Sequence, residues 1–216
     1  MDFLKTQQVA VAVENVLPQH PRQRTAIVLG GSSGGTSMVA AVLHGLGVYM
    51  GEWSDLRRGG AFENPAMLYA EAETERCNGL YDVWGFKNPK GVSALKSLPE
   101  STRNPYGIVI FRDPIAVAQR LLARHPDLHK DRTFADVVEE AASYYEQLRR
   151  AVVARPWPRL WISYERAKSD SPFFVRSIID FLGLKPTTAQ TAEAVSRVVG
   201  GYLNPPAVCK WTEQTS

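Results

Sequence analysis

The sequence has little cysteine and no long hydrophobic run. Its 216 residues include two cysteines, Cys77 and Cys209, which lie far apart and have neither a CxxC spacing nor an adjacent histidine. Such a pair gives no zinc site and no disulfide framework, so we expect free thiols and no metal. No run approaches the roughly 18 apolar residues of a membrane-spanning helix, and the N-terminus has no secretory signal pattern. The sequence therefore predicts a cytoplasmic protein without a membrane span.

A strong excess of either charge is also missing. The 25 Lys and Arg residues against 22 Asp and Glu residues give a formal net charge of +3. A nucleic-acid-binding domain usually gathers its basic residues in a stripe with aromatic residues between them. The arginines here are scattered in short pairs, such as Arg57 with Arg58. We therefore expect no nucleic-acid partner, and we interpret the small basic excess as suited to a small anionic ligand.

Short apolar runs alternate with helical patterns along most of the chain. We predict strands at residues 26–29 (AIVL), 83–86 (VWGF), 106–111 (YGIVIF) and 160–163 (LWIS). Apolar residues recur at helical spacing over 38–46, 134–148 and 173–181, and residues 65–81 are also expected to be helical. Strands that alternate with helices favour a single α/β domain, in which helices cover both faces of a mostly parallel sheet.

Several of these helices have recognisable first and last residues. Pro114 follows Asp113 at the expected first position of one helix, where its missing N–H costs no hydrogen bond. Thr133 with Asp136 three residues later is typical of a helix start, and Gly183 is typical of a helix end. The sequence therefore predicts helices that begin near residues 114 and 134 and one that ends before residue 183.

The strongest local signal is the sequence GGSSGGTS at residues 30–37, between a predicted strand and a predicted helix. Glycines let the main chain turn tightly with its N–H groups aimed at one point, where the positive end of the helix dipole also attracts an anion. A Walker A loop has lysine where Thr36 stands, which disfavours ordinary ATP or GTP chemistry. The turn predicts a phosphate site; the alternative is a glycine-rich turn without a ligand.

The N-terminal residues before this turn have a looser pattern. Apolar residues over 3–17 are compatible with a helix that ends before Pro18. We therefore predict an N-terminal helix and linker at residues 1–24 and a nucleotide-binding domain at residues 25–216.

Several segments, in order, resemble the sulfotransferase family. GGSSGGTS, followed by LHGLGV at 43–48, is similar to that family's G-x-x-R-S-G-T-S turn and L-x-x-L-G-V helix end. IVIFRDP at 108–114 resembles its strand and R-D-P turn, and YE at 164–165 with FLGL at 181–184 resembles its Y-E-x-L … F-L-G-L segment. AFEN at 61–64 and WGFKNP at 84–89 resemble the bacterial branch. The resemblance covers about residues 25–184.

This resemblance implies a P-loop NTPase-like, three-layer fold and a reaction. The reaction is transfer of a sulfonyl group from 3′-phosphoadenosine 5′-phosphosulfate (PAPS) to a hydroxyl or amine of a small-molecule or glycan acceptor, with no metal. The resemblance places the 3′-phosphate of PAPS at Arg112 and Arg120, and implies Glu63 and Lys87 as catalytic residues. The phosphosulfate is expected over the turn, at Gly31, Ser32, Ser33, Gly34, Gly35, Thr36 and Ser37.

The turn departs from the family pattern at two positions. Ser33 stands where the family usually has Arg or Lys, and Gly34 stands where it usually has serine. Arg120 likewise replaces a serine on the 3′-phosphate, but its planar guanidinium suits phosphate at least as well. We predict Lys87 as the replacement for the cation that is missing at Ser33, because it ends a short strand expected in the same sheet.

Each of these residues also has a simpler interpretation. Arg112 can form an ion pair with Asp113, Glu63 can be a solvated loop carboxylate, and His44 is expected to be a packed histidine near a helix end. Trp84 and Tyr164 are expected in the core or behind the site. A P-loop kinase or nucleotide hydrolase and a non-catalytic nucleotide-binding protein remain as alternative functions.

Overall fold

The structure is a computed structural model that describes residues 11–51, 71–88, 91–96 and 98–200. Its centre is a five-stranded sheet with the strand order β1-β5-β4-β2-β3. The strands are β1 (Val11–Glu14), β2 (Arg24–Leu29), β3 (Val83–Asn88), β4 (Pro105–Phe111) and β5 (Arg159–Ser163). β2 pairs in parallel with β3 and β4, and β4 pairs in parallel with β5, whereas β1 is an antiparallel edge strand. The predicted single, mostly parallel sheet is confirmed.

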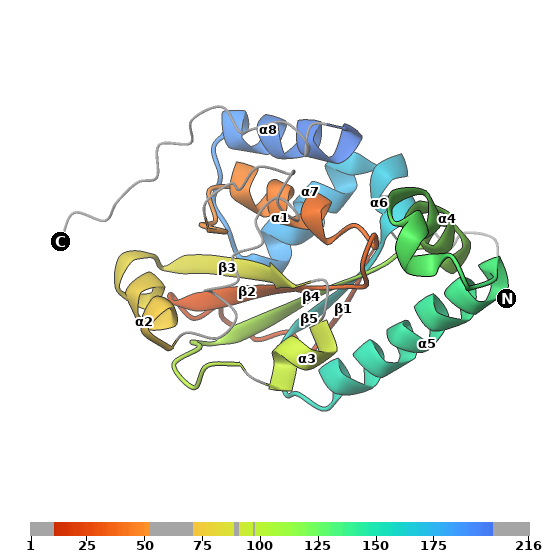
Figure 1. Cartoon of the computed structure of the whole chain (residues 1–216). Helices are drawn as coiled ribbons and strands as arrows, with labels where there is room; N and C mark the ends of the chain where they lie inside the picture. Colours follow the sequence, from red (N-terminus) through yellow and green to blue (C-terminus); the bar gives the residue numbers. More distant parts are fainter. Residues whose placement is uncertain (1–10, 52–70, 89–90, 97, 201–216) are drawn as a thin grey trace, which may run out of the picture.

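Helices cover both faces of this sheet (Figure 1). The described helices are α1 (Thr36–Gly45), α2 (Glu71–Leu80), α3 (Gly91–Lys96), α4 (Pro114–Arg124), α5 (Phe134–Val153), α6 (Tyr164–Ser169), α7 (Ser171–Leu182) and α8 (Thr188–Val199), with a short 3₁₀ helix at Pro126–His129. α1, α7 and α8 lie over one face, and α3 and α5 lie over the other. The arrangement has the three layers that the resemblance implied.

Alternate residues of each strand fill two separate cores. Ala26 and Val28 on β2 pack with α1 and α7, whereas Ile27 and Leu29 pack beneath β2 with Leu148 of α5. Strands buried on both faces explain why 26–29 and 106–111 are continuous apolar runs rather than alternating ones. None of the helices in the described segments is both long enough and apolar enough to span a bilayer.

The chain order makes the carboxyl ends of β2 and β4 the expected place for a ligand. From β2 the chain passes through α1 to β3 on one side, while β4 lies on the other side of β2. In open α/β sheets, this change of direction leaves room for a ligand beyond the strand ends. Leu29 of β2 is in register with Asn88 of β3 and Val109 of β4, so the segments that follow these strands emerge at the same edge.

The helix starts and ends follow the predicted residues. Asp113 caps α4 by accepting the N–H of Ala116, and Thr133 and Asp136 form a reciprocal capping box on α5. Gly183 ends α7 in the left-handed conformation. These local predictions are confirmed because each depends on hydrogen bonds within a few residues.

The predicted helix at residues 3–17 is wrong for the part that the structure describes. Val11–Glu14 forms β1 and pairs antiparallel with β5, from Val11 opposite Ile162 to Glu14 opposite Arg159. Arg159 Nε also donates to Glu14 Oε2 at 2.8 Å. The strand conformation comes from pairing with a distant segment, which outweighs a weak helical pattern. These residues therefore belong to the sheet and not to a helical arm.

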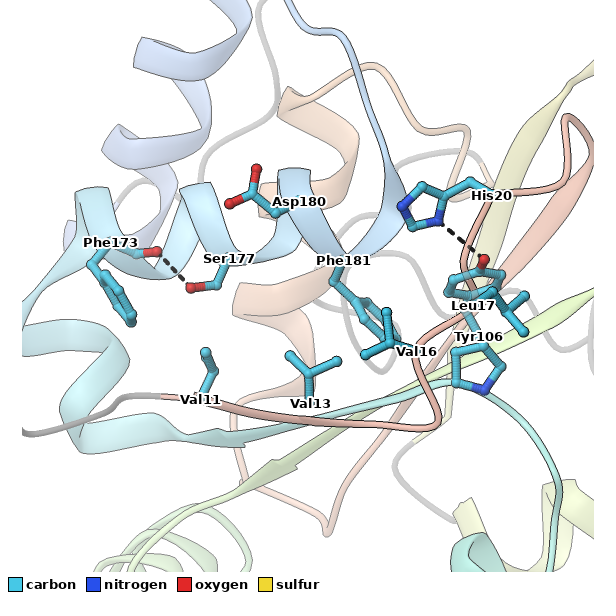
Figure 2. Close-up of a pocket in the computed structure, with 11 residues that line it drawn as sticks. Val11, Val13, Val16, Leu17, His20, Tyr106, Phe173, Ser177, Asp180 and Phe181 are labelled. Carbon is cyan, nitrogen blue, oxygen red and sulfur yellow. Dashed lines mark hydrogen bonds between the residues drawn. The ribbon is translucent and has the colours of Figure 1, made fainter.

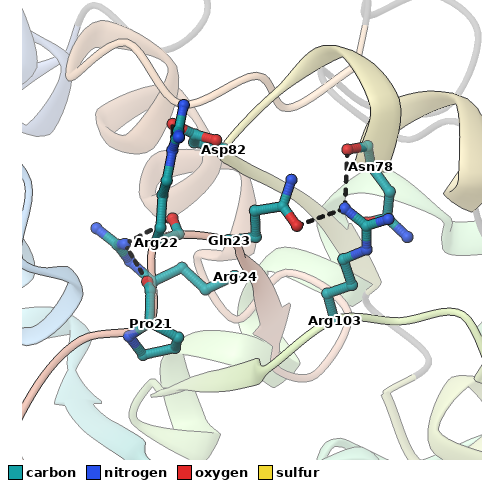
Figure 3. A network of polar contacts seen from close by, with 7 residues as sticks. All are labelled: Pro21, Arg22, Gln23, Arg24, Asn78, Asp82 and Arg103. Carbon is teal, nitrogen blue, oxygen red and sulfur yellow. Dashed lines mark hydrogen bonds and ion pairs between the residues drawn. The ribbon is translucent and has the colours of Figure 1, made fainter.

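Polar contacts fasten the segment between β1 and β2 to the amino end of the sheet (Figure 3). The buried guanidinium of Arg24 donates to the main-chain oxygens of Pro21 and Gly183 at 2.7 and 3.2 Å. Arg103 donates to Gln23 Oε1 at 2.6 Å. These contacts lie at the end of the sheet away from the glycine-rich turn, so we interpret them as structural.

Candidate functional site

The glycine-rich turn connects the carboxyl end of β2 to α1. Gly34 N–H donates to Gly31 O at 2.9 Å, and Gly35 has a φ of +102°. A Cβ at Gly35 would lie 2.4 Å from Tyr164 Cδ2, and one at Gly34 would lie 2.8 Å from Gly31 O. The turn therefore has this shape only with glycine at both positions.

The start of α1 is suited to an anion. Its first turn contains no acidic residue, and Gly35 offers no side-chain cap to the N–H groups there. Unfilled N–H groups and the positive end of the helix dipole attract negative charge. Thr36 is buried and Ser37 is half-buried, so the first two residues of α1 both carry hydroxyl groups. The turn and the helix start together have the geometry of a phosphate or sulfate site.

Lys87 brings a positive charge to this point from β3. Its side chain is 2% exposed, and Nζ donates to Ser37 Oγ at 2.8 Å. Lys87 is in register with Val28 of β2 and lies on the α1 side of the sheet, because Trp84 and Phe86 pack into the opposite core. The ammonium therefore reaches the turn, as the sequence led us to expect. Burial of a charge is costly, and polar partners such as Ser37 Oγ offset this cost.

Arg112 brings a second positive charge from the end of β4. Its Nη1 donates to Ser33 O at 3.0 Å, and the guanidinium lies 4.7 Å from the centre of the Tyr164 ring. Ser33 has a φ of +60°, a left-handed conformation that is uncommon for serine. Within the described residues Arg112 forms no ion pair with Asp113, whose carboxylate accepts the Ala116 N–H instead. The alternative interpretation of Arg112 as a strand-end ion pair is therefore wrong.

Two side chains from other elements hold the main chain after β4. Arg112 N–H donates to Tyr145 Oη at 3.1 Å, and Asp113 N–H donates to Glu165 Oε1 at 3.0 Å. Tyr145 comes from α5 and Glu165 from α6. The sequence placed Tyr145 only on the apolar face of a helix, and no local pattern reveals its contact with a residue 33 positions away.

Other predicted site residues are not brought to the turn by the described contacts. Arg120 is half-buried on the second turn of α4, and its convergence with Arg112 stays a prediction. Glu63 lies outside the described residues, so its role as a base also stays a prediction.

His44 is a packed histidine near the end of α1, as expected. It is 5% exposed, and its pKa is lowered to about 4, mainly by burial and also by Arg197, whereas Glu193 acts in the opposite direction. Cys77 is a buried free thiol whose pKa is raised to about 12, mainly by burial. A thiol that stays protonated in this way is not a reactive nucleophile at neutral pH. Trp84 is buried in the core, as expected.

A separate hollow lies between β1 and α7 (Figure 2). Its volume is about 360 Å³ and its lining is mostly apolar, with Val13, Phe173 and Phe181 among the lining residues. His20 Nδ1 and Tyr106 Oη lie 3.1 Å apart at its edge. Tyr106 stands near the amino end of β4, whereas Arg112 follows the carboxyl end, so this hollow is not part of the turn.

The described residues also include no group of three or more His, Cys, Asp or Glu side chains that could hold a metal ion.

Comparisons with known proteins give a fold and no sequence relative. No protein-family model matches the chain, and no curated protein matches it significantly. Among solved structures, it is similar to the sulfotransferase domain of the olefin synthase from Synechococcus PCC 7002, with 17% identity and a TM-score of 0.53 over 87% of this chain and 82% of that one. It is also similar to mouse sulfotransferase SULT7A1 complexed with PAP, with 16% identity and a TM-score of 0.53 over 88% and 69%. The chain therefore has the sulfotransferase fold.

Proposed function

We propose that the chain is a sulfotransferase that moves a sulfonyl group from PAPS to a hydroxyl or amine of a small-molecule or glycan acceptor. One observation carries the proposal: two cations from different strands meet the glycine-rich turn, Lys87 at Ser37 Oγ and Arg112 at Ser33 O. A turn with two cations and an uncapped helix start suits a ligand with several negative charges. The mouse neighbour of the same fold was solved with PAP, the desulfated donor, which supports this ligand class.

The residues of the turn fit the phosphosulfate end of such a donor. In the proposal, residues 31–37 bind it through main-chain N–H groups and hydroxyls, and Arg112 and Arg120 bind the 3′-phosphate. PAPS supplies an activated sulfonyl group. Both the transferred and the leaving groups are anionic, so the chain contributes mainly positioning and charge neutralisation. Lys87 supplies the cation that the turn itself lacks.

Glu63 is proposed as the base that accepts the acceptor's proton. Glu63→Gln keeps the shape of the side chain and removes its basicity. We expect the affinity for the donor to persist while transfer falls by roughly 10²–10⁴-fold, as for other general bases. An unchanged rate would show that Glu63 is a solvated loop carboxylate and not the base.

A nucleotide-binding panel tests the ligand class. Adenosine 3′,5′-bisphosphate at a hundredfold excess over its dissociation constant should stabilise the protein by about 2.7 kcal/mol. That corresponds to a rise in melting temperature of roughly 5–10 °C for a chain of this size. Adenosine 5′-monophosphate should give a much smaller shift because it lacks the 3′-phosphate.

A matched pair of variants makes the panel specific. Arg112→Lys keeps the charge but loses the planar fork that binds phosphate in two places, so it should reduce the shift. Arg124→Lys makes the same change at an exposed position of α4 and should leave the shift in melting temperature intact.

Equal shifts with both nucleotides would refute the proposed ligand. Magnesium-dependent ATP turnover would identify a kinase or hydrolase instead, and binding without transfer would identify a non-catalytic nucleotide-binding protein. A cytoplasmic location stays a prediction from the sequence.

A further inference from the structure

Tyr145 places a phenol hydroxyl directly against the glycine-rich turn. The residue stands on α5, and its Oη lies 3.3 Å from the position that a Cβ at Gly34 would occupy. Its ring carbon Cε1 lies 3.4 Å from the corresponding position at Gly31. The hydroxyl therefore borders the part of the turn that has no side chains of its own.

The hydrogen bonds of this hydroxyl are incomplete on the donor side. Tyr145 Oη accepts the N–H of Arg112 at 3.1 Å, which uses one of its lone pairs. A tyrosine hydroxyl also has one hydrogen to donate. Within the described part of the chain, that hydrogen has no acceptor. A half-buried donor without a partner is unfavourable, and an anion in the turn would supply the missing acceptor.

The surroundings keep the hydroxyl protonated and oriented. Burial is the main reason that the pKa of Tyr145 is raised; Glu165 and Asp113 act in the same direction, and Arg112 opposes them. The ring packs edge-to-face against Phe111, with centroids 5.0 Å apart and planes at 69°. A donor held in place before the ligand arrives costs no reorganisation when charge develops.

We propose that Tyr145 donates its phenol hydrogen to the anionic group bound in the turn and stabilises the negative charge that develops there during transfer. This inference rests on the proposed function. The turn at residues 30–37 contains no lysine or arginine, so beyond its main-chain N–H groups and hydroxyls any further donor comes from outside it. In the reaction, a bond forms between the acceptor atom and sulfur while the bond from sulfur to the bridging oxygen breaks. The electron pair stays on the leaving phosphate, the acceptor's proton passes to the base, and Tyr145 keeps its own proton.

Tyr145→Phe tests the proposal through two readouts. The variant keeps the ring and loses the hydroxyl, and loss of one such donor typically lowers kcat by about 10²–10³-fold. The dissociation constant of adenosine 3′,5′-bisphosphate should rise by no more than about tenfold, from the loss of one hydrogen bond to its 5′-phosphate, so kcat should fall much further than the affinity. If Tyr145 only holds the main chain of Arg112, the affinity for the bisphosphate and the rate should fall by the same factor. That result, or an unchanged kcat, would overturn the proposal.

Tyr106→Phe is the matched control. It removes a buried phenol hydroxyl at the amino end of β4, where the partner is His20 and not the turn. Both kcat and the affinity for the bisphosphate should stay near wild type. A loss of kcat equal to that of Tyr145→Phe would mean that any buried hydroxyl has the same effect, which would also overturn the proposal.

Fluorinated tyrosine at position 145 separates donation from packing. It keeps the ring and the contact with Arg112 but lowers the pKa of the phenol. The alkaline limb of the kcat profile should therefore move to lower pH as fluorine is added, whereas a purely structural hydroxyl would leave it in place.

The outcomes also separate this inference from the proposed function. A wild type that neither binds the bisphosphate nor transfers would refute both. A wild type that transfers, with Tyr145→Phe equally active, would refute only the role of Tyr145. If the wild type binds PAPS without transfer, the readout becomes the dissociation constant of PAPS. Tyr145→Phe should then raise it about tenfold, and an unchanged value would overturn the proposal.

Discussion

Replacing Lys87 by methionine changes stability and function in different ways. The side chain is 2% exposed, and its ammonium donates to Ser37 Oγ at 2.8 Å. Methionine has a similar length and an adaptable apolar side chain, so it can fill the space beneath α1. A buried hydrogen bond to a charged group contributes about 1.5–3 kcal/mol, and its loss destabilises the variant. Removal of a buried charge in favour of an apolar side chain offsets this by about 1–4 kcal/mol.

These opposing effects largely cancel, so the free energy of unfolding of Lys87→Met should lie within roughly 2 kcal/mol of wild type. Transfer has no such compensation. Removal of a preorganised group that stabilises developing charge costs about 3–4 kcal/mol, or 10²–10³-fold in kcat. The expected variant is therefore stable and nearly inactive.

Urea denaturation and a transfer assay on the same preparation measure both quantities. Lys96→Met, at an exposed lysine of α3, is the control and should leave both unchanged. The reasoning is refuted if Lys87→Met retains wild-type transfer. It is also refuted if the variant loses more than about 3 kcal/mol of stability, because Lys87 would then be a structural residue.

Three further predictions concern the turn and the helix behind it. Ser33→Arg should partly restore transfer to Lys87→Ala, because it returns a cation to the turn; no recovery would show that the two positions are not interchangeable. Gly35→Ala should cost about 2–4 kcal/mol in urea denaturation, because it adds backbone strain to a contact with Tyr164. Gly47 has a similar φ, but a Cβ there would meet only the movable end of the Gln190 side chain. An equal loss of stability in Gly47→Ala would therefore contradict this reasoning. The neutral form of His44 is favoured in the folded state, since its pKa is lowered from 6.5 to about 4. The free energy of unfolding should therefore be highest above pH 6.5 and fall by about 3 kcal/mol as the pH drops to 4. His44→Gln should remove this part of the pH dependence.

The sequence predicted best where structure depends on neighbouring residues. The strand at 26–29, the turn and α1 follow from glycines and an apolar run, and the capping box of Thr133 and Asp136 needs contacts only three residues apart. The same kind of signal starts α8, where Thr187 and Gln190 form a capping box. The helix was predictable from this pattern, but we did not predict it.

Features that depend on distant residues were not predictable in the same way. Val11–Glu14 is a strand because it pairs with β5, which follows it by more than a hundred residues. The contacts of Tyr145 with Arg112 and of Glu165 with Asp113 each join different elements. Periodicity identifies the buried face of a helix but not the residue that it will touch. The direction of Lys87 was predictable only because it lies near the carboxyl end of a short strand, and the carboxyl ends of parallel strands meet at the edge of the sheet where the turn lies.

Transfer of labelled sulfur from PAPS is the most direct test of the account. Wild-type protein, Lys87→Met and Arg124→Lys are incubated with PAPS labelled at sulfur and a broad set of alcohols, phenols and amines. The labelled product and adenosine 3′,5′-bisphosphate are then measured together. The account predicts equal amounts of both products with wild type and Arg124→Lys, and at least a hundredfold less with Lys87→Met. Binding of PAPS without labelled product for any acceptor, or equal transfer by all three proteins, would contradict it.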